Sequence, residues 1–128
     1  MPAPLLTLSP EPVPVPPEAD GGAWGAEITF LGRVRGTENG RPISGIEYTA
    51  YLPMALQCLE RIAADLQKAH GEHPLRIHHR LGFVPTGEAS ILIAVGGRHS
   101  PETFALCAEY LKRIKSGVPV WKGIRYAD

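Results

Sequence analysis

Five basic side chains are the residues of this sequence best suited to chemistry. Arg35, Arg98, His99, Lys115 and Lys122 all fall where a predicted strand or helix begins or ends, and such positions commonly carry binding and catalytic groups. Arginine holds phosphate through a planar fork of N–H donors, histidine exchanges protons near neutral pH, and a desolvated lysine acts as a nucleophile or base. Since the group contains no paired carboxylate, it indicates a site for an anionic ligand.

Lys115 also has a purely structural interpretation. It follows Lys112 by three residues on a predicted helix whose other face is apolar, and most lysines in such places only solvate the surface. Spacing alone therefore leaves both a catalytic and a surface role open for Lys115.

Metal and cofactor sites are not expected. The run His78-His79-Arg80 contains two metal-binding side chains, but neighbouring residues of a strand point to opposite faces, and no cysteine or carboxylate completes a ligand set. The glycines from Gly32 to Gly40 do not connect a strand to a helix, as a dinucleotide-binding loop requires. We therefore expect no bound metal ion and no cofactor.

Composition restricts the class of protein. The 128 residues suit one domain with its own core, and 13 Lys and Arg balance 13 Asp and Glu. This balance disfavours nucleic acid and anionic membranes as partners, so any positive site must be local. Cys58 and Cys107 have no metal or redox spacing and are expected to be free thiols. Without a long apolar run or a signal peptide, the protein is expected to be cytoplasmic.

A proline-rich segment precedes the predicted globular part. Residues 1–22 carry most of the prolines, which disfavour both helices and sheets, so we expect an extended N-terminal arm. The arm is either a strap across a partner subunit or a lead-in without a function of its own. Residues 23–128 form the predicted domain.

Apolar periodicity within this domain predicts an α+β fold with a mainly antiparallel sheet and two main helices. Alternation predicts strands over 26–34 and 43–51, which Asn39-Gly40 joins as a hairpin. It predicts a third strand over 75–81, in which His79 shares a face with Leu75 and Ile77. A central strand is expected over 89–95 and a partly extended tail over 118–126. The helices are expected from Pro53 to before Gly71, and after Ser100 as the cap, with a stripe of Phe104, Cys107, Ala108 and Leu111.

Several segments together resemble the large subunit of molybdopterin synthase, over a match that runs from about Gly25 to Lys122. The order and separation of the segments carry the resemblance more than any one of them. They are Gly25-Ala26, Phe30-Leu31-Gly32-Arg33-Val34-Arg35, Glu47-Tyr48-Thr49-Ala50-Tyr51 with Met54-Ala55, His79-Arg80-Leu81-Gly82, Gly87-Glu88, and Lys115 followed by Pro119-Val120-Trp121-Lys122.

The resemblance implies a fold of the α/β hammerhead type and a homodimer with a small ubiquitin-like sulfur carrier at each end. It implies sulfur transfer from the thiocarboxylated C-terminus of this carrier to cyclic pyranopterin monophosphate, which yields molybdopterin. By the same resemblance, Lys115 and Lys122 match the catalytic lysines of the family, while Arg35 and His99 match its phosphate and pterin pocket.

The sequence departs from the family pattern at three places. Ser100 stands where the family usually has an arginine after the histidine, and Arg98 before His99 is a candidate to bind the same phosphate. The proline-rich arm replaces a helix. Because the tail is shorter, the arginine that the family offers to a neighbouring subunit has no clear match, and Arg125 is a candidate for it. The alternative to an active enzyme is a non-catalytic relative that only docks the carrier or dimerises.

Overall fold

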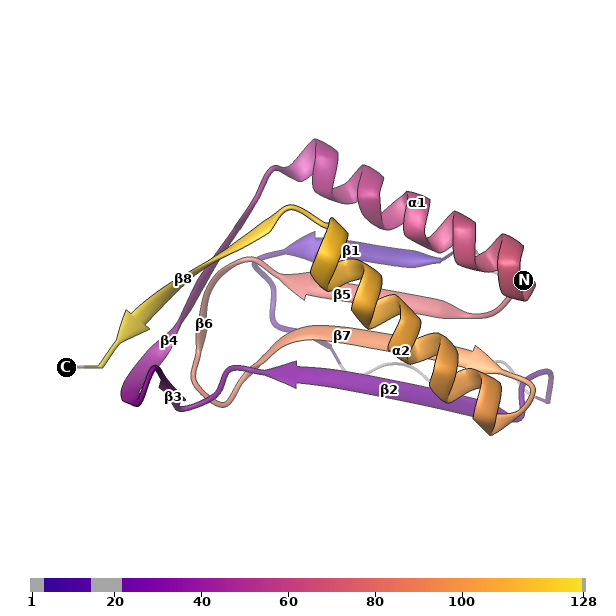
Figure 1. Ribbon diagram of the computed structural model, residues 1–128, viewed down its shortest axis with the longest axis horizontal. Coiled ribbons are helices and arrows are strands. Elements are labelled where there is room, and N and C mark those ends of the chain that lie inside the picture. The colour runs from indigo at the N-terminus through magenta and orange to yellow at the C-terminus, as the bar shows by residue number, and fades with distance from the viewer. Residues whose placement is uncertain (1–3, 15–21, 128) are drawn as a thin grey trace.

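The computed structural model describes residues 4–14 and 22–127 and contains two helices packed on two sheets. Figure 1 shows both helices on the same side of the longer strands. The elements are β1 Leu5–Ser9, β2 Ala26–Arg33, β3 Thr37–Glu38, β4 Arg41–Ala50, α1 Leu52–His70, β5 Leu75–Arg80, β6 Gly82–Pro85, β7 Ala89–Gly97, α2 Ser100–Gly117 and β8 Val120–Tyr126. Neither helix is long and apolar enough, in the described part of the chain, to cross a membrane.

The larger sheet has the strand order β1-β5-β7-β2. β7 pairs antiparallel with both β5 and β2, while β1 pairs parallel with β5. β7 therefore lies inside the sheet, as its apolar sequence predicts, and seven of its nine residues are buried. The α+β class and the predominance of antiparallel pairing are confirmed.

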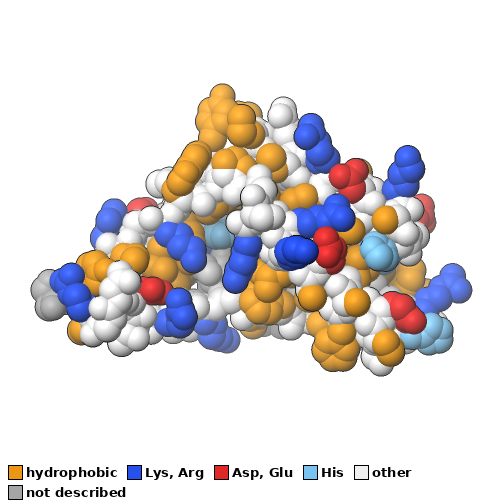
Figure 2. Space-filling model, in the orientation of Figure 1, with side chains coloured by type: hydrophobic (Ala, Val, Ile, Leu, Met, Phe, Trp, Pro, Cys, Tyr) orange, Lys and Arg blue, Asp and Glu red, His pale blue; other side chains and the backbone are white. Residues whose placement is uncertain are grey.

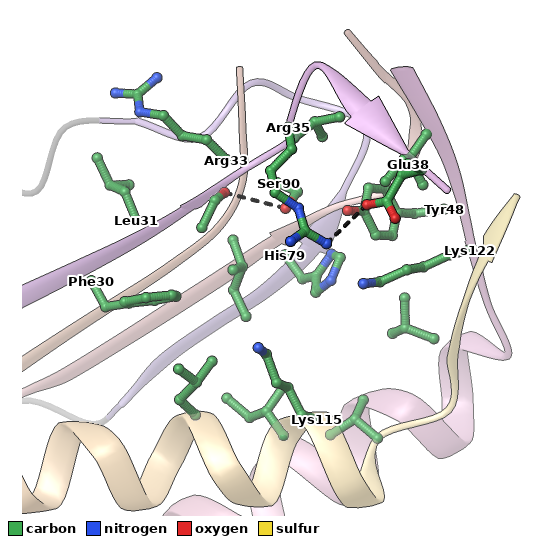
Figure 3. Close-up of a pocket in the computed structure, with 18 residues that line it drawn as sticks. Phe30, Leu31, Arg33, Arg35, Glu38, Tyr48, His79, Ser90, Lys115 and Lys122 are labelled. Carbon is green, nitrogen blue, oxygen red and sulfur yellow. Dashed lines mark hydrogen bonds and ion pairs between the residues drawn. The ribbon is translucent and has the colours of Figure 1, made fainter. Parts of the chain in front are cut away.

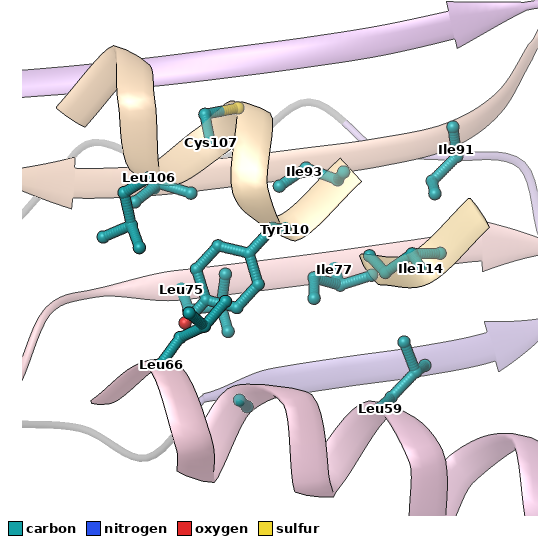
Figure 4. Packing of buried hydrophobic residues seen from close by; sticks show 12 residues of the cluster. Leu59, Leu66, Leu75, Ile77, Ile91, Ile93, Leu106, Cys107, Tyr110 and Ile114 are labelled. Carbon is teal, nitrogen blue, oxygen red and sulfur yellow. The ribbon is translucent and has the colours of Figure 1, made fainter. Parts of the chain in front are cut away.

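The main core lies between this sheet and the two helices. Figure 4 shows side chains of α1, α2 and the strands meeting there, and the fully buried ones include Leu59, Ile77, Ile93 and Tyr110. Burying a large apolar side chain contributes roughly 1.5–3 kcal/mol, so this layer is what holds α2 against β7 and β2.

The smaller sheet extends from one end of the molecule. It has the order β3-β4-β6, and β8 pairs with β4 from Ile43 to Ala50, a stretch that includes the residues paired with β6. A second core of Val34, Ile43, Ile46, Tyr48 and Val84 lies within it. The antiparallel register places Tyr48 of β4 opposite Lys122 of β8, so this sheet fixes where Lys122 lies.

The helix boundaries agree with the sequence, but two local details do not. Helix α1 buries Ala55, Leu59, Ala63 and Leu66 and ends at Gly71, whose φ of 83° favours glycine. At α2 the cap position is His99 and no side chain caps the helix, so the prediction of Ser100 as the cap is wrong.

The predicted apolar stripe of α2 is also only partly correct. Cys107 is buried, but Phe104 is 61% exposed and Ala108 is exposed too. The buried residues are Thr103, Leu106, Cys107, Tyr110 and Ile114. The helix is rotated relative to the prediction because Tyr110, a polar aromatic, fills the core with its hydroxyl bonded to His73.

The predicted hairpin between the first two strands is wrong as well. Asn39 and Gly40, with φ of 55° and 74°, do form a tight turn, but it joins β4 to the two-residue β3. β2 pairs with β7 instead. Two further strands were not expected: β1, which lies inside the proline-rich segment, and β6. The domain boundary predicted at residue 22 adjoins residues 15–21, which lie outside the described ranges.

Candidate functional site

A cavity of about 650 Å³ lies where the two sheets meet the C-terminal end of α2. Its walls come from the end of β2, the middle of β4, the end of β5, the start of β7, the last turn of α2 and β8. Four basic side chains line it against a single carboxylate: Arg33, Arg35, Lys115 and Lys122 against Glu38. Figure 2 shows Lys and Arg side chains gathered around this hollow. The excess of positive charge suits an anionic ligand.

Lys115 and Lys122 enter the cavity from different elements. Lys115 follows buried Ile114 in the last turn of α2, and Lys122 lies on β8 next to the turn that follows this helix. Figure 3 shows both ammonium groups directed into the cavity, one from the helix and one from the strand. Lys115 is thus an exposed residue whose ammonium group is directed into the cavity.

Arg35 reaches the cavity from the loop that follows β2. Its Nη2 lies 3.0 Å from Oε1 of Glu38, and the Arg35 side chain is 78% exposed. An ion pair this exposed is weak, worth about 0–1 kcal/mol, so an incoming phosphate can replace Glu38. Arg33 is already engaged, because its Nη1 donates to the carbonyl of Gly87 at 2.9 Å.

His79 also lines the cavity, although the site predicted from the sequence did not include it. Its ring contacts Tyr48 edge to face, with 5.0 Å between ring centroids. Burial lowers the pKa of His79 below its ordinary 6.5, and the positive charge of Lys122 acts in the same direction. A histidine at an otherwise apolar position of an alternating strand was the available signal.

Arg98 and His99 do not line this cavity within one chain. They are exposed and precede α2, whereas Lys115 lies near the end of that helix. At about 1.5 Å per residue the helix separates His99 from Lys115 by roughly 24 Å. The structure therefore brings together Arg35, Lys115 and Lys122, and it leaves Arg98 and His99 apart from them.

The two adjacent histidines of β5 point to opposite faces of the sheet. Nε2 of His78 lies 3.2 Å from the carbonyl of Glu11, while His79 faces the cavity. Among residues 4–14 and 22–127, no three or more His, Cys, Asp or Glu side chains are grouped so as to hold a metal ion.

Fold and site together define the class of protein: an α+β domain with two lysines and two arginines around one cavity, an arrangement that suits an anion. The model of the MoaE protein family matches residues 14–117, so the chain belongs to this family.

Among the proteins to which this chain is similar are a curated relative and a solved structure, both named as molybdopterin synthase. The molybdopterin synthase catalytic subunit of Nostoc sp. is 39% identical over 111 residues, which are 86% of this chain and 67% of that protein. Molybdopterin synthase from Staphylococcus aureus has a structure similar to this one at a TM-score of 0.74 and 30% identity, covering 82% of this chain and 81% of that one.

A third similarity is to a complex. The structure of subunits 1 and 2 of molybdopterin-converting factor from Helicobacter pylori matches at a TM-score of 0.67 and 24% identity, over 82% of this chain and 73% of that one. At this identity the match supports the fold only. The chain spans about half to two thirds of the length of the curated relatives that it matches. In three of them the matched part is 52% to 67% of the relative's length.

Proposed function

We propose that this chain is the catalytic subunit of a molybdopterin synthase, which transfers sulfur from a small ubiquitin-like carrier to cyclic pyranopterin monophosphate and so forms molybdopterin. The observation that carries the proposal is the convergence of Lys115, Lys122 and Arg35 on one cavity. The proposal agrees with the names of relatives at about 40% identity.

The chemistry assigned to each residue follows from its type and position. Arg35 holds the phosphate of the pterin through bidentate hydrogen bonds, in exchange for Glu38. Lys115 exchanges protons or accepts the acyl group of the carrier, and Lys122 stabilises the negative charge that develops during transfer. Both lysines line the same cavity, which is necessary if they act on the same reacting groups.

An exposed apolar surface supports docking of the carrier beside the cavity. Tyr51 and Leu52 at the start of α1 and Trp121 on β8 are each at least half exposed. Figure 2 shows hydrophobic side chains gathered over the start of α1 and the adjoining part of β8. Trp121 directly precedes Lys122 on β8, so this apolar surface includes part of the strand that carries Lys122. Exposed aromatic groups are typical centres of protein interfaces.

A second copy of the chain completes the proposal. Arg98 and His99 can contact a ligand in the cavity only from another copy, since α2 separates them from Lys115 in their own chain. β2 stands last in the strand order, so its outer edge is available to a partner. We propose a homodimer with one carrier at each end, located in the cytoplasm, in which Arg98, His99 and Arg125 serve the site of the neighbouring copy.

The decisive experiment is a sulfur-transfer assay with purified protein, a thiocarboxylated carrier and the pterin monophosphate. Formation of molybdopterin with loss of the thiocarboxylate supports the proposal. A protein that binds the carrier but neither binds nor converts the pterin is a docking module, and that result would refute the enzymatic function.

A further inference from the structure

His79 is held in one tautomer by the backbone. Its Nδ1 lies 2.9 Å from the carbonyl oxygen of Arg80. Because a carbonyl oxygen can only accept, Nδ1 carries the proton, and the neutral ring then has its lone pair on Nε2. The edge-to-face contact with Tyr48 at 5.0 Å, with ring planes at 70°, restricts rotation of the ring.

The Nε2 atom of His79 is open to the cavity. Within the described part of the chain it makes no hydrogen bond, and the buried side-chain polar atoms that lack a partner there include only Nε of Arg80. Nε2 is therefore accessible rather than sealed in the core. Figure 3 shows the His79 ring projecting into the same part of the cavity as the ends of Arg35 and Lys122.

The surroundings of His79 keep it neutral at physiological pH. Desolvation lowers its pKa most, the hydrogen bond to the Arg80 carbonyl opposes this, and the charges of His78 and Lys122 lower it further. The titratable or charged groups that share the cavity come from five elements and the loop after β2. They are Tyr48, Lys115, Lys122, Glu38, Arg33 and Arg35.

The proposed sulfur transfer needs a proton acceptor. When the thiocarboxylate sulfur bonds to a carbon of the pterin side chain, a carbon–oxygen bond at that carbon breaks with its electron pair on oxygen. The carrier is then joined to the pterin through an acyl–sulfur bond. Water must then attack the acyl carbon: a carbon–oxygen bond forms, the carbon–sulfur bond breaks with its electron pair on sulfur, and the carrier leaves as a carboxylate. One proton of this water passes to a base during the attack, and the other is lost when the carboxylic acid ionises.

We infer that His79 is the general base for this hydrolysis, with Nε2 accepting the proton of the attacking water. The inference rests on the proposed function. Lysine ammonium groups have no lone pair, so Lys115 and Lys122 serve as acids or electrostatic groups in this step. Glu38 pairs with Arg35 at 3.0 Å only until the phosphate takes its place. His79 differs from this carboxylate because the Arg80 carbonyl and the Tyr48 ring fix the direction of its acceptor in the cavity.

The test is a single turnover in water enriched in oxygen-18, followed by mass spectrometry of the carrier. The parent protein should release carrier carboxylate containing one heavy oxygen. His79→Gln should form the covalent carrier–pterin adduct but hydrolyse it roughly a hundredfold more slowly, the effect typical of a lost general base. His79→Phe retains an aromatic ring beside Tyr48 and should accumulate the same adduct. This second variant keeps the test valid if His79→Gln does not fold.

The pH dependence separates catalysis by His79 from a merely structural role. In the parent, hydrolysis should rise with pH to a plateau, with a midpoint below 6.5, because only the neutral ring accepts a proton. Both His79 variants should lose this rise, while His78→Gln, the adjacent histidine on the opposite face, should retain it. Nitrogen NMR of the parent should show Nε2 unprotonated at pH 7.

Different failures have different meanings. Hydrolysis at the parent rate with the parent pH profile in either folded His79 variant would overturn the role of His79 and leave the proposed function intact. A protonated Nε2 at pH 7 would do the same. A parent protein that forms no carrier–pterin adduct and consumes no thiocarboxylate would overturn the proposed function, and the role of His79 with it.

Discussion

The lysine at position 115 has a side chain that can be removed without disturbing its helix. It is exposed at its base in the last turn of α2, and alanine is the best helix former. Lys115→Ala should therefore stay folded and bind the carrier normally, but should form molybdopterin roughly a hundredfold more slowly or worse. Circular dichroism and the sulfur-transfer assay measure the two effects. Lys112→Ala, on the same helix outside the cavity, is the control; near-parent activity of Lys115→Ala would remove Lys115 from the catalytic machinery.

If Arg35 binds the substrate phosphate as proposed, Glu38 competes with the substrate for Arg35. The pair is separated by 3.0 Å but largely exposed on the arginine side, so breaking it costs only about 0.2–1 kcal/mol. Glu38→Gln should lower KM for the pterin phosphate by roughly two- to fivefold, because Arg35 is freed and a negative charge leaves the cavity. Glu109→Gln removes a comparable ion pair with Arg113 on α2 and should leave KM as it is. A higher KM in Glu38→Gln would show that Glu38 orients Arg35 instead of competing for it.

Sequence reasoning reached the lysines and Arg35 more easily than the rest of the cavity. The family resemblance singles out Lys115 and Lys122 without any knowledge of the fold, whereas spacing alone leaves the role of Lys115 open. Glu38, in the two-residue strand β3, carries no such signal. His79 stands in one of the segments that resemble the family, but its place among apolar positions of a strand was not interpreted as a site. Their importance depends on which strands meet, and β2 pairs with β7 across more than 50 residues of sequence.

At the scale of the elements, the β4–β8 pair determines where Lys122 lies. Gly45 of β4 is buried against β6, and a Cβ built there would overlap the carbonyl oxygen of Val84 and the ring of Phe83. Gly45→Ala should therefore lower the free energy of unfolding by about 1–3 kcal/mol. Urea denaturation measures this loss. Gly36→Ala is the matched control, because its Cβ would meet only Thr86 at 3.7 Å, and an equal loss in both variants would contradict the steric argument.

A buried hydrogen bond ties α2 to the loop between α1 and β5. Nε2 of His73 lies 2.6 Å from the hydroxyl of Tyr110, and Nδ1 lies 2.7 Å from the carbonyl oxygen of Gly71. Since that carbonyl only accepts, Nδ1 donates to it, and Nε2 accepts from Tyr110. Burial lowers the pKa of His73 and raises that of Tyr110, so both groups are held neutral.

The pKa of His73 makes stability depend on pH. The unfolded chain binds a proton near pH 6.5 and the folded chain only at lower pH, so the free energy of unfolding falls as the pH drops below about 6.5. One such group contributes a slope of at most about 1.4 kcal/mol per pH unit. Urea denaturation from pH 5 to 7.5 should show that the free energy of unfolding depends less steeply on pH in His73→Gln than in the parent. The pH dependence that remains in the variant is due in part to His79. An unchanged slope would contradict this assignment.

The elements differ in how far the sequence predicted them. Both helices and β7 have strong apolar periodicity, which depends on local spacing and was therefore readable. β1 was missed because it lies among prolines and gains its hydrogen bonds only from β5, about 70 residues later. The same long-range pairing explains the wrong partner predicted for β2. Local propensity indicates extended backbone, but which edge it pairs with is decided by tertiary packing.

At the scale of the whole molecule, one chain contains only part of the predicted anion site. Arg98 and His99 lie at the start of α2 and Lys115 near its end, a separation that no side-chain movement closes. If these residues act on one ligand, the ligand must lie between two copies arranged with twofold symmetry. Light scattering at working concentration should give twice the mass of the chain, and a strictly monomeric protein would exclude a shared site.

Mixing two inactive variants tests the shared site directly. In a shared arrangement, a dimer of one Lys115→Ala copy and one His99→Ala copy has one doubly defective site and one intact site. Random exchange makes half of the dimers mixed, so activity should recover to about a quarter of the parent value. His99 caps α2 with its backbone alone, so alanine there preserves the helix. If mixing restores nothing although native mass spectrometry shows mixed dimers, Lys115 and His99 do not serve one site across the interface, and the phosphate is held by Arg35 and the lysines of a single chain.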